Sequence, residues 1–161
     1  MKTVYIETSV VSYLTARPSR DVVAAAHQHV THLWWNTRRP LFQSFISEIV
    51  EGEASAGDPG AAERRLAALE GIDILDLDDK ALALARKLMD ECGLPEAAKI
   101  DATHIAIAAV HGMDYLVTWN CRHIDNAEIK PVVRSVCALN GYACPEICTP
   151  EELMGDWHYE G

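Results

Sequence analysis

Apolar and polar stretches alternate along this chain in a way that predicts strands separated by helices. Runs rich in β-branched and aromatic residues predict four strands, at residues 4–6, 41–46, 73–77 and 115–118, and a short edge strand at 146–148. Apolar positions at helical spacing fill the segments between them. This alternation is typical of an α/β/α sandwich with a central, mainly parallel sheet, which is the fold that we expect. We expect one domain over residues 1–153 and a frayed C-terminal tail at 154–161.

Polar residues mark where several of these helices begin. An Asp or Ser at such a point can accept a hydrogen bond from a free backbone N–H of the first turn. Four residues have this position: Asp21, Ser47, Asp58 and Asp78. Pro59 follows one of them, at the first helical position that proline favours. We expect Leu66, on the helix after Pro59, and Val23, on the helix after Asp21, to face the core.

Residues 99–126 contain a nearly uncharged helix followed by a strand. The helix is expected to begin near Glu96 and to break at Gly112. Asp101 lies in its first turns, and Asn120 comes just after the strand. Ligands bind at the carboxyl ends of strands in open parallel sheets, so we expect Asp101 and Asn120 to converge there.

The composition, with 49% hydrophobic and 24% charged residues, is ordinary for a soluble globular protein. No run approaches the roughly 18 apolar residues of a membrane-spanning helix, and the N-terminus is a poor signal peptide. We therefore expect a cytoplasmic protein. The five cysteines indicate reduced thiols. Cys144 and Cys148 could share a metal ion, but no second pair completes a zinc site, so we expect a structural role for both.

The formal net charge of −10 argues against broad electrostatic binding of nucleic acid. It does not exclude a nuclease, because carboxylates that hold a divalent metal ion contribute to this count and the bound ion reverses the local charge. A negative chain also suits a basic partner.

Four oxygen-bearing side chains are expected at one edge of the sheet. They are Glu7 after the first strand, Glu53 on the helix after the second strand, Asp101 and Asn120. Mg²⁺ takes one or two carboxylates and retains several waters. Two such ions can activate a water and stabilise the leaving oxygen of a phosphodiester. The set therefore indicates metal-dependent hydrolysis, without a catalytic His or a nucleophilic Ser.

Several segments resemble the motifs of PIN-domain proteins, the fold of VapC-type toxin ribonucleases. They are VYIETSV, FISEIVEGE, KIDATHIAIAAVHGMDYLVTWNCRHI and EICTPEEL, and they span nearly the whole chain. The resemblance implies a Rossmann-like PIN sandwich and an Mg²⁺- or Mn²⁺-dependent endoribonuclease that hydrolyses RNA phosphodiester bonds. It also implies the toxin of a type II toxin–antitoxin pair, a homodimer, and an antitoxin that inserts a segment near the active site.

The resemblance assigns roles to three of the four side chains as metal ligands. Glu7 matches the first acid of the family, which is usually Asp, and Asp101 matches the helix Asp. Asn120 lies where an Asp is typical. By this match, Glu7, Asp101 and Asn120 hold the metal ion.

The helix after the second strand offers three acids for the fourth catalytic position. Glu53 is favoured, because its spacing from Ser47 matches the family pattern, and Glu48 and Glu51 are the alternatives. Glu48 and Glu53 are five positions apart and cannot share one helical face well.

Two departures from the family pattern favour a second interpretation. Glu7 carries its carboxylate one methylene farther out than Asp, and a small misplacement can lower a reaction rate strongly. Asn120 is neutral and binds a second cation less tightly than Asp. The alternative is a catalytically weakened PIN-like domain that binds RNA or a protein. A receiver or phosphatase-like domain is disfavoured, because its first strand normally ends in an Asp that accepts the phosphoryl group.

Other side chains near the expected site have two interpretations each. Thr8 and Ser9 could bind a metal-bound water or the scissile phosphate, or they could cap a helix. His104, one helical turn from Asp101, could assist the site, although a packed histidine is favoured. Arg122 is an expected phosphate contact, and the further candidates are Arg17, Arg20, His123 and Lys130.

The aromatic residues and the remaining histidines are expected to be mainly structural. Trp34 and Trp35 are assigned to the core or a dimer interface, whereas Trp119 could stack on bases. A solvated surface is expected for three histidines of one helix: His27, His29 and His32.

Overall fold

The computed structural model describes residues 1–156, so the expected tail at 154–161 lies largely outside the described residues. Five strands form one sheet in the order β3-β2-β1-β4-β5, and every neighbouring pair is parallel. The strands are β1 (Thr3–Ile6), β2 (Gln43–Ser47), β3 (Asp73–Leu75), β4 (Tyr115–Val117) and β5 (Glu146–Cys148). The predicted parallel α/β sandwich is confirmed.

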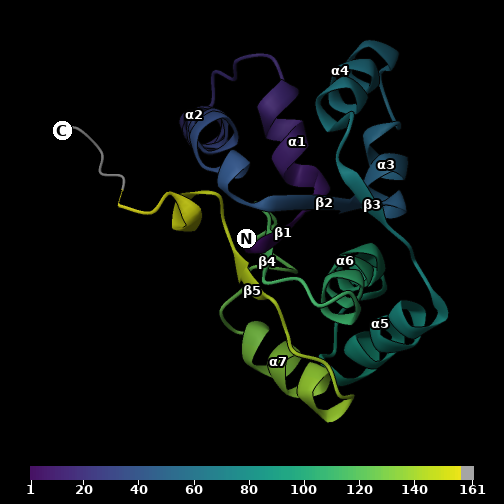
Figure 1. Cartoon of the computed structure of the whole chain (residues 1–161). Helices are drawn as coiled ribbons and strands as arrows, with labels where there is room; N and C mark the ends of the chain where they lie inside the picture. Colours follow the sequence, from purple (N-terminus) through teal and green to yellow (C-terminus); the bar gives the residue numbers. More distant parts are fainter. Residues whose placement is uncertain (157–161) are drawn as a thin grey trace.

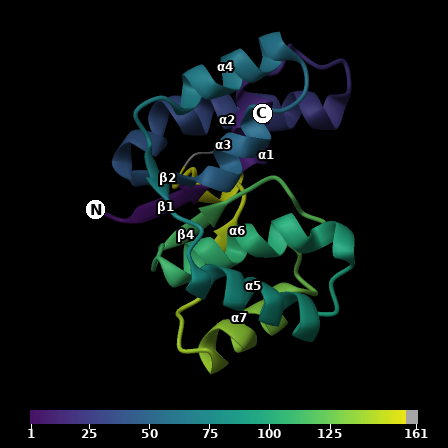
Figure 2. The same cartoon turned by 90° about the vertical axis from the view of Figure 1, so that its right-hand side faces the viewer.

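Helices cover both faces of the sheet (Figures 1 and 2). One face carries α1 (Thr8–Thr15), α2 (Val22–Thr37), α3 (Glu48–Ala54) and α4 (Pro59–Leu69). The other face carries α5 (Asp79–Glu91), α6 (Lys99–Val110) and α7 (Lys130–Leu139). Three short 3₁₀ helices complete the chain: η1 (Arg39–Leu41), η2 (Glu96–Ala98) and η3 (Glu151–Leu153).

Side chains cap four helices at the positions that the sequence predicts. Each cap accepts a hydrogen bond from a first-turn N–H that has no partner within the helix. The cap and donor pairs are Asp21 and Ala24, Ser47 and Val50, Asp58 and Ala61, and Asp78 and Ala81. After α6, Gly112 adopts φ +68°, and this left-handed turn leads the chain into β4.

Some element boundaries differ from the expected ones by a few residues. β2 begins at Gln43 because Arg39–Leu41 form η1 around Pro40. The helix expected from about residue 127 begins at Lys130, with Pro131 in its first turn. The missing N–H of proline costs nothing at that position, because first-turn donors have no partner within the helix.

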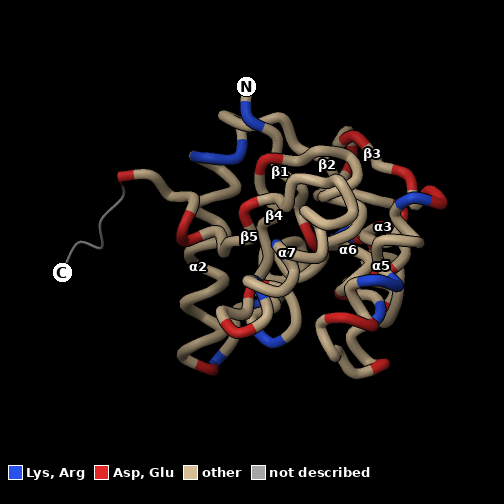
Figure 3. The backbone as a smooth tube through the Cα atoms, turned by 90° about the horizontal axis from the view of Figure 1, so that it is seen from below, with Lys and Arg blue, Asp and Glu red and all other residues tan. Residues whose placement is uncertain are grey.

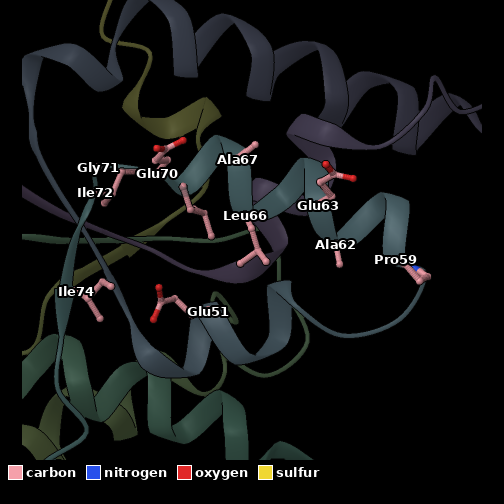
Figure 4. A pocket seen from close by; sticks show the side chains of 11 residues that line it. Glu51, Pro59, Ala62, Glu63, Leu66, Ala67, Glu70, Gly71, Ile72 and Ile74 are labelled. Carbon is pink, nitrogen blue, oxygen red and sulfur yellow. The ribbon is translucent and has the colours of Figure 1, made fainter.

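Two residues expected in the core are exposed. Leu66 is 40% exposed, because this face of α4 borders an open groove of about 650 Å³ beside α3 and β3 (Figure 4). Three carboxylates line the same groove: Glu51, Glu63 and Glu70. Val23 is 62% exposed, because it lies in the first turn of α2, and the buried residues of that helix begin only at Val30.

Helix α6 is the most deeply buried helix in the described part of the chain. Eight consecutive residues, from Ala102 to Ala109, are buried, so the helix has no solvent-facing side along this length. Four of them are alanines, and their small side chains let α6 fit between the sheet and α5. This burial explains why, His104 apart, residues 102–109 are all apolar or small.

The strand order creates a switch point between β1 and β4. The chain leaves β1 for α1 on one face of the sheet, whereas it leaves β4 for α7 on the other face (Figure 1). Loops that diverge from neighbouring parallel strands leave a crevice at their carboxyl ends. Helix α6 precedes β4 and runs opposite to it, so the first turn of α6 lies at the same edge of the sheet.

All five cysteines are free thiols, as the sequence predicts. Cys144 and Cys148 belong to no metal-binding group among residues 1–156. Burial raises the pKa of Cys148 to about 12, so this thiol stays protonated. Within the same residues, no helix combines the length and the apolar character that crossing a membrane requires.

Candidate functional site

Glu7 follows β1 and caps α1. Its Oε1 accepts hydrogen bonds from Ser9 Oγ and Thr118 Oγ1, both at 2.6 Å, and its Oε2 accepts one from the Ser9 backbone N–H at 2.9 Å. The residue is only 5% exposed. Three donors and the N-terminus of a helix stabilise the buried carboxylate. The residue that caps α1 is therefore Glu7, and the Ser9 hydroxyl holds the carboxylate of this cap instead of capping a helix itself.

Glu53 reaches the same edge from α3. Its Oε1 lies 2.8 Å from Thr8 Oγ1, which donates to it, and 2.6 Å from His104 Nε2. Burial raises the pKa of Glu53, but the hydrogen bonds from His104 and Thr8 and the charge of His104 outweigh it, so the net shift is downward. The other acids of α3 lie elsewhere. Glu48 accepts from the Leu77 backbone N–H at 2.9 Å, and Glu51 lines the groove of Figure 4.

His104 connects Glu53 to a buried chain of hydroxyl groups. Its Nδ1 lies 2.6 Å from Tyr5 Oη, which lies 2.8 Å from Ser47 Oγ. Burial raises the pKa of Tyr5 far above its ordinary value, so the phenol is neutral. The histidine is 1% exposed, as expected of a packed residue, and it also contacts a site carboxylate. The interpretation as a packed histidine is therefore confirmed, and assistance to the site stays a prediction.

Asp101 and Asn120 converge as the sequence predicts. Asp101 Oδ1 accepts from Asn120 Nδ2 at 3.0 Å, and Oδ2 lies 3.0 Å from His123 Nδ1. Asn120 Oδ1 accepts the backbone N–H groups of His123 and Arg122, at 3.0 and 3.3 Å. A second Asp at position 120 would repel Asp101, whereas the neutral amide donates to it. The pair is therefore satisfied by protein groups alone.

Thr118, at the end of β4, joins the two parts of the site. Its Oγ1 donates to Glu7 and accepts the Asn120 backbone N–H at 2.9 Å. The backbone N–H of Trp119, the residue between Thr118 and Asn120, donates to Ser9 Oγ at 2.8 Å. The turn after β4 is thereby fixed to the turn after β1.

A family model described as PIN domain matches residues 4–128, which is most of the chain. The chain belongs to the PIN domain family. Among curated protein sequences, none matches the chain.

Solved structures with the PIN fold resemble this chain at low sequence identity. VapC20 of Mycobacterium tuberculosis, a toxin that cleaves the sarcin–ricin loop, aligns with a TM-score of 0.58 and 16% identity over 74% of this chain and 92% of its own. A chain from FitAB bound to the IR36 DNA fragment gives 0.56 and 15%, with 98% of each chain covered. VapBC2 of Rickettsia felis, bound to DNA from its promoter, gives 0.53 and 15% over 91% of this chain and 98% of its own. At this identity the likeness supports the fold alone.

The PIN domain contains one group of acidic and histidine side chains, within residues 1–156, that could hold a metal ion: Glu7, Glu53 and His104. One ligand atom from each residue lies within 4.8 Å of the others. Oε2 of Glu53 has no hydrogen-bond partner in the described part of the chain. Two carboxylates and an imidazole form a donor set that suits a divalent cation. Asp101 lies outside this group, and its two oxygens contact Asn120 and His123.

Trp119 does not offer its ring to a base, so the prediction of base stacking is wrong. The indole is 9% exposed, and its Nε1 donates to Thr31 Oγ1 at 2.7 Å. His27 stacks on it with ring centroids 4.0 Å apart and planes 12° apart. The prediction of a purely solvated His27 is therefore wrong as well. Trp34 lies in the core, as expected.

The basic residues named from the sequence divide into two kinds. Lys130 forms an ion pair with Asp125 at 2.6 Å, and His123 contacts Asp101, so both have acidic partners. Arg17, Arg20 and Arg122 are exposed. In Figure 3, acidic and basic segments are interspersed over the visible elements.

The sequence interpretation missed several contacts within the site. The roles of Tyr5 and Ser47 beneath His104 were not expected, nor was the part that Thr118 has in holding Glu7. The contact of His123 with Asp101 could have been predicted, because His123 lies only three residues after Asn120 in the same turn. Tyr5 gave no signal, because it is an ordinary residue for the centre of a buried strand.

Proposed function

We propose that this PIN domain is a divalent-metal-dependent endoribonuclease that hydrolyses RNA phosphodiester bonds and acts as the toxin of a type II toxin–antitoxin pair. The observation that carries the proposal is the approach of Glu7 and Glu53, which with His104 offer ligand atoms within 4.8 Å of one another. Asp101 lies outside this group, three positions before His104 on α6, and is bonded to Asn120 in the turn after β4. Membership of the PIN family supports the same activity.

The proposed roles follow from the contacts of each side chain. A cation bound at this edge supplies an activated water and stabilises charge on the phosphate; Mg²⁺ and Mn²⁺ are the candidates. The buried Glu7 and the partly exposed Glu53 would hold this cation. Asp101 adds a ligand through lone pairs that its two contacts leave free, with Asn120 beside it.

Substrate contacts are proposed for two residues of the turn after β4. Arg122 is exposed, and its side chain has no partner among residues 1–156, so it is available to a phosphate. His123 is fixed through Nδ1, and its Nε2 has no partner in the same residues, so it can contact the phosphate or the leaving oxygen, donating to it when the ring carries both protons. Thr8 and Ser9 hold the two carboxylates and contribute to the site by positioning them.

Partners are proposed from the PIN family and from charge. The FitAB and VapBC2 assemblies are bound to DNA fragments, and we propose for this chain a cognate antitoxin and a homodimer. The net charge of −10 suits an antitoxin with a basic segment.

The first test is cleavage of a mixed RNA pool with Mg²⁺ or Mn²⁺ by the wild type and by Asp101→Ala. Glu63→Gln, an exposed acid of α4, is the matched control. We expect cleavage by the wild type and the control, inhibition by a chelator, and loss of cleavage in Asp101→Ala. Equal cleavage by all three proteins would exclude Asp101 from the active site.

A second function, a PIN-like module that binds without cutting, is favoured by one observation. Asn120 donates directly to Asp101, so this pair needs no cation to be satisfied. In that case calorimetry with Mg²⁺ or Mn²⁺ detects no binding, and RNA is retained on the protein uncut.

A further inference from the structure

His104 lies below the proposed site and directs one ring nitrogen toward it. The residue belongs to the buried length of α6 and is three positions beyond Asp101, so both project from the same face of the helix. Its Nε2 meets the Glu53 carboxylate at 2.6 Å, while Nδ1 meets Tyr5 Oη. The imidazole is therefore fixed in one orientation before any ligand arrives.

We propose that His104 is a metal ligand through Nε2, together with Glu7 and Glu53, and that the site therefore prefers Mn²⁺ and Co²⁺ to Mg²⁺. The inference deepens the proposed function, because it concerns the cation of the same site. It replaces a set made only of oxygen ligands by a mixed set of nitrogen and oxygen.

The distances between the three side chains allow a shared ion. Their ligand atoms all lie within 4.8 Å of one another. Ligands about 2.0–2.2 Å from one ion are at most about 4.4 Å apart, so shifts of a few tenths of an ångström complete the site. Glu53 can supply the movement, since its side chain is 41% exposed, whereas His104 and Glu7 are buried.

The contact at Nδ1 is the arrangement that a metal-binding histidine requires. Such a histidine donates its second ring N–H to an oxygen, which fixes the tautomer. Without a cation, Nε2–H donates to Glu53. In the tautomer that a cation at Nε2 requires, the Nε2 proton is released, Nδ1–H donates to Tyr5 Oη, and the phenol donates in turn to Ser47 Oγ. Ser47 Oγ also accepts the Val50 backbone N–H. Tyr5 and Ser47 therefore keep their hydrogen-bond partners when the Nε2 lone pair of His104 faces a cation.

The donor set determines which ions are favoured. Mg²⁺ prefers oxygen ligands and retains its waters, so a buried imidazole adds little to its binding. Affinity for sites with nitrogen ligands rises from Mn²⁺ to Co²⁺. The ratio of the affinity for a transition-metal ion to the affinity for Mg²⁺ should therefore be larger for Co²⁺ than for Mn²⁺. This ratio should fall when His104 is replaced.

The test measures binding and ligand identity without RNA. Calorimetry on the full-length protein compares Mg²⁺, Mn²⁺ and Co²⁺, and pulsed electron paramagnetic resonance of the Mn²⁺-loaded protein detects imidazole nitrogen. His104→Gln removes the proposed ligand. His123→Gln is the matched control, because His123 is the other histidine bonded to a site carboxylate.

We expect a nitrogen signal in the wild type and in His123→Gln, and none in His104→Gln. Co²⁺ affinity should fall at least about tenfold in His104→Gln, with a much smaller change for Mg²⁺. A wild-type complex without a nitrogen signal, or a signal that survives in His104→Gln, overturns the proposal. If His104→Gln does not fold, Tyr5→Phe keeps the ring and removes the oxygen that fixes Nδ1. The proposal then requires Co²⁺ affinity to fall about tenfold, and an unchanged affinity contradicts it.

The result is separable from the nuclease activity. A protein that binds Co²⁺ through His104 but cuts no RNA contradicts the proposed function and leaves this inference in place. A protein that cuts RNA with no nitrogen bound to its cation contradicts this inference and leaves the proposed function in place.

Discussion

Thr118 Oγ1 donates a hydrogen bond of 2.6 Å to Glu7 Oε1, so the end of β4 holds the carboxylate at the end of β1. The same hydroxyl accepts the Asn120 backbone N–H. One buried side chain thus fixes the spacing between the two strand ends at the switch point of the sheet.

Thr118→Val should lower both stability and RNA cleavage. The substitution keeps the shape of the side chain but removes a donor from a buried carboxylate, which costs about 1–3 kcal/mol of unfolding free energy. Urea unfolding measures the loss. Thr37→Val, at the exposed end of α2, is the control and should change stability much less. Equal losses in the two variants would contradict the role of Thr118.

Asn120→Asp should make the stability of the protein depend on metal. Without a cation, the new carboxylate at position 120 repels that of Asp101, whereas the amide of Asn120 donates a hydrogen bond to it. The melting temperature of the variant in a chelator should therefore lie below that of the wild type. A bound cation should restore it, because ligands that bind the folded state stabilise it. Thermal unfolding with and without Mn²⁺ measures the difference. The exposed Asn36→Asp should respond to neither condition.

Glu53 should make part of the stability depend on acid pH. Its folded pKa lies below the ordinary value of 4.5, so its contribution is present above pH 4.5 and is lost as the pH falls through the folded pKa. The unfolding free energy of the wild type should therefore decrease more steeply below pH 4.5 than that of Glu53→Gln. Thr8→Val removes one of the hydrogen bonds that lower this pKa, so its slope should lie between the two. If the unfolding free energy of the wild type and of Glu53→Gln fell equally with pH, a contribution of Glu53 would be ruled out.

Trp119→Ala should destabilise the protein more than Trp35→Ala. Trp119 is buried against His27 and bonded to Thr31, and truncating such a residue costs about 3–5 kcal/mol. Trp35 is only half-buried, with Arg39 4.4 Å above its ring, so its loss should be smaller. Denaturant unfolding compares the two. Base stacking by Trp119 would instead appear as weaker RNA binding at unchanged stability.

The sequence predicted those parts of the fold that depend on neighbouring residues. The caps formed by Asp21 and Asp78 each satisfy an N–H three positions away, so a short motif was sufficient to find them. The convergence of Asp101 and Asn120 followed from the rule that ligands bind at strand ends.

The remaining site contacts join residues that are far apart in the sequence. Tyr5 and His104 are 99 positions apart, and no local pattern indicates that one contacts the other. Trp119 and His27 meet only because α2 packs against the turn after β4. The exposed Leu66 has the helical spacing of a core residue, and only the open groove beside β3 distinguishes it.

The three side chains of the proposed cation site differ sharply in exposure: Glu53 is the accessible one, whereas Glu7 and His104 are almost fully covered. A particle that travels from solvent to His104 Nε2 therefore encounters the Glu53 carboxylate first. In the proposed site, Glu53 is thus the ligand that an ion meets first on entry and leaves last on departure.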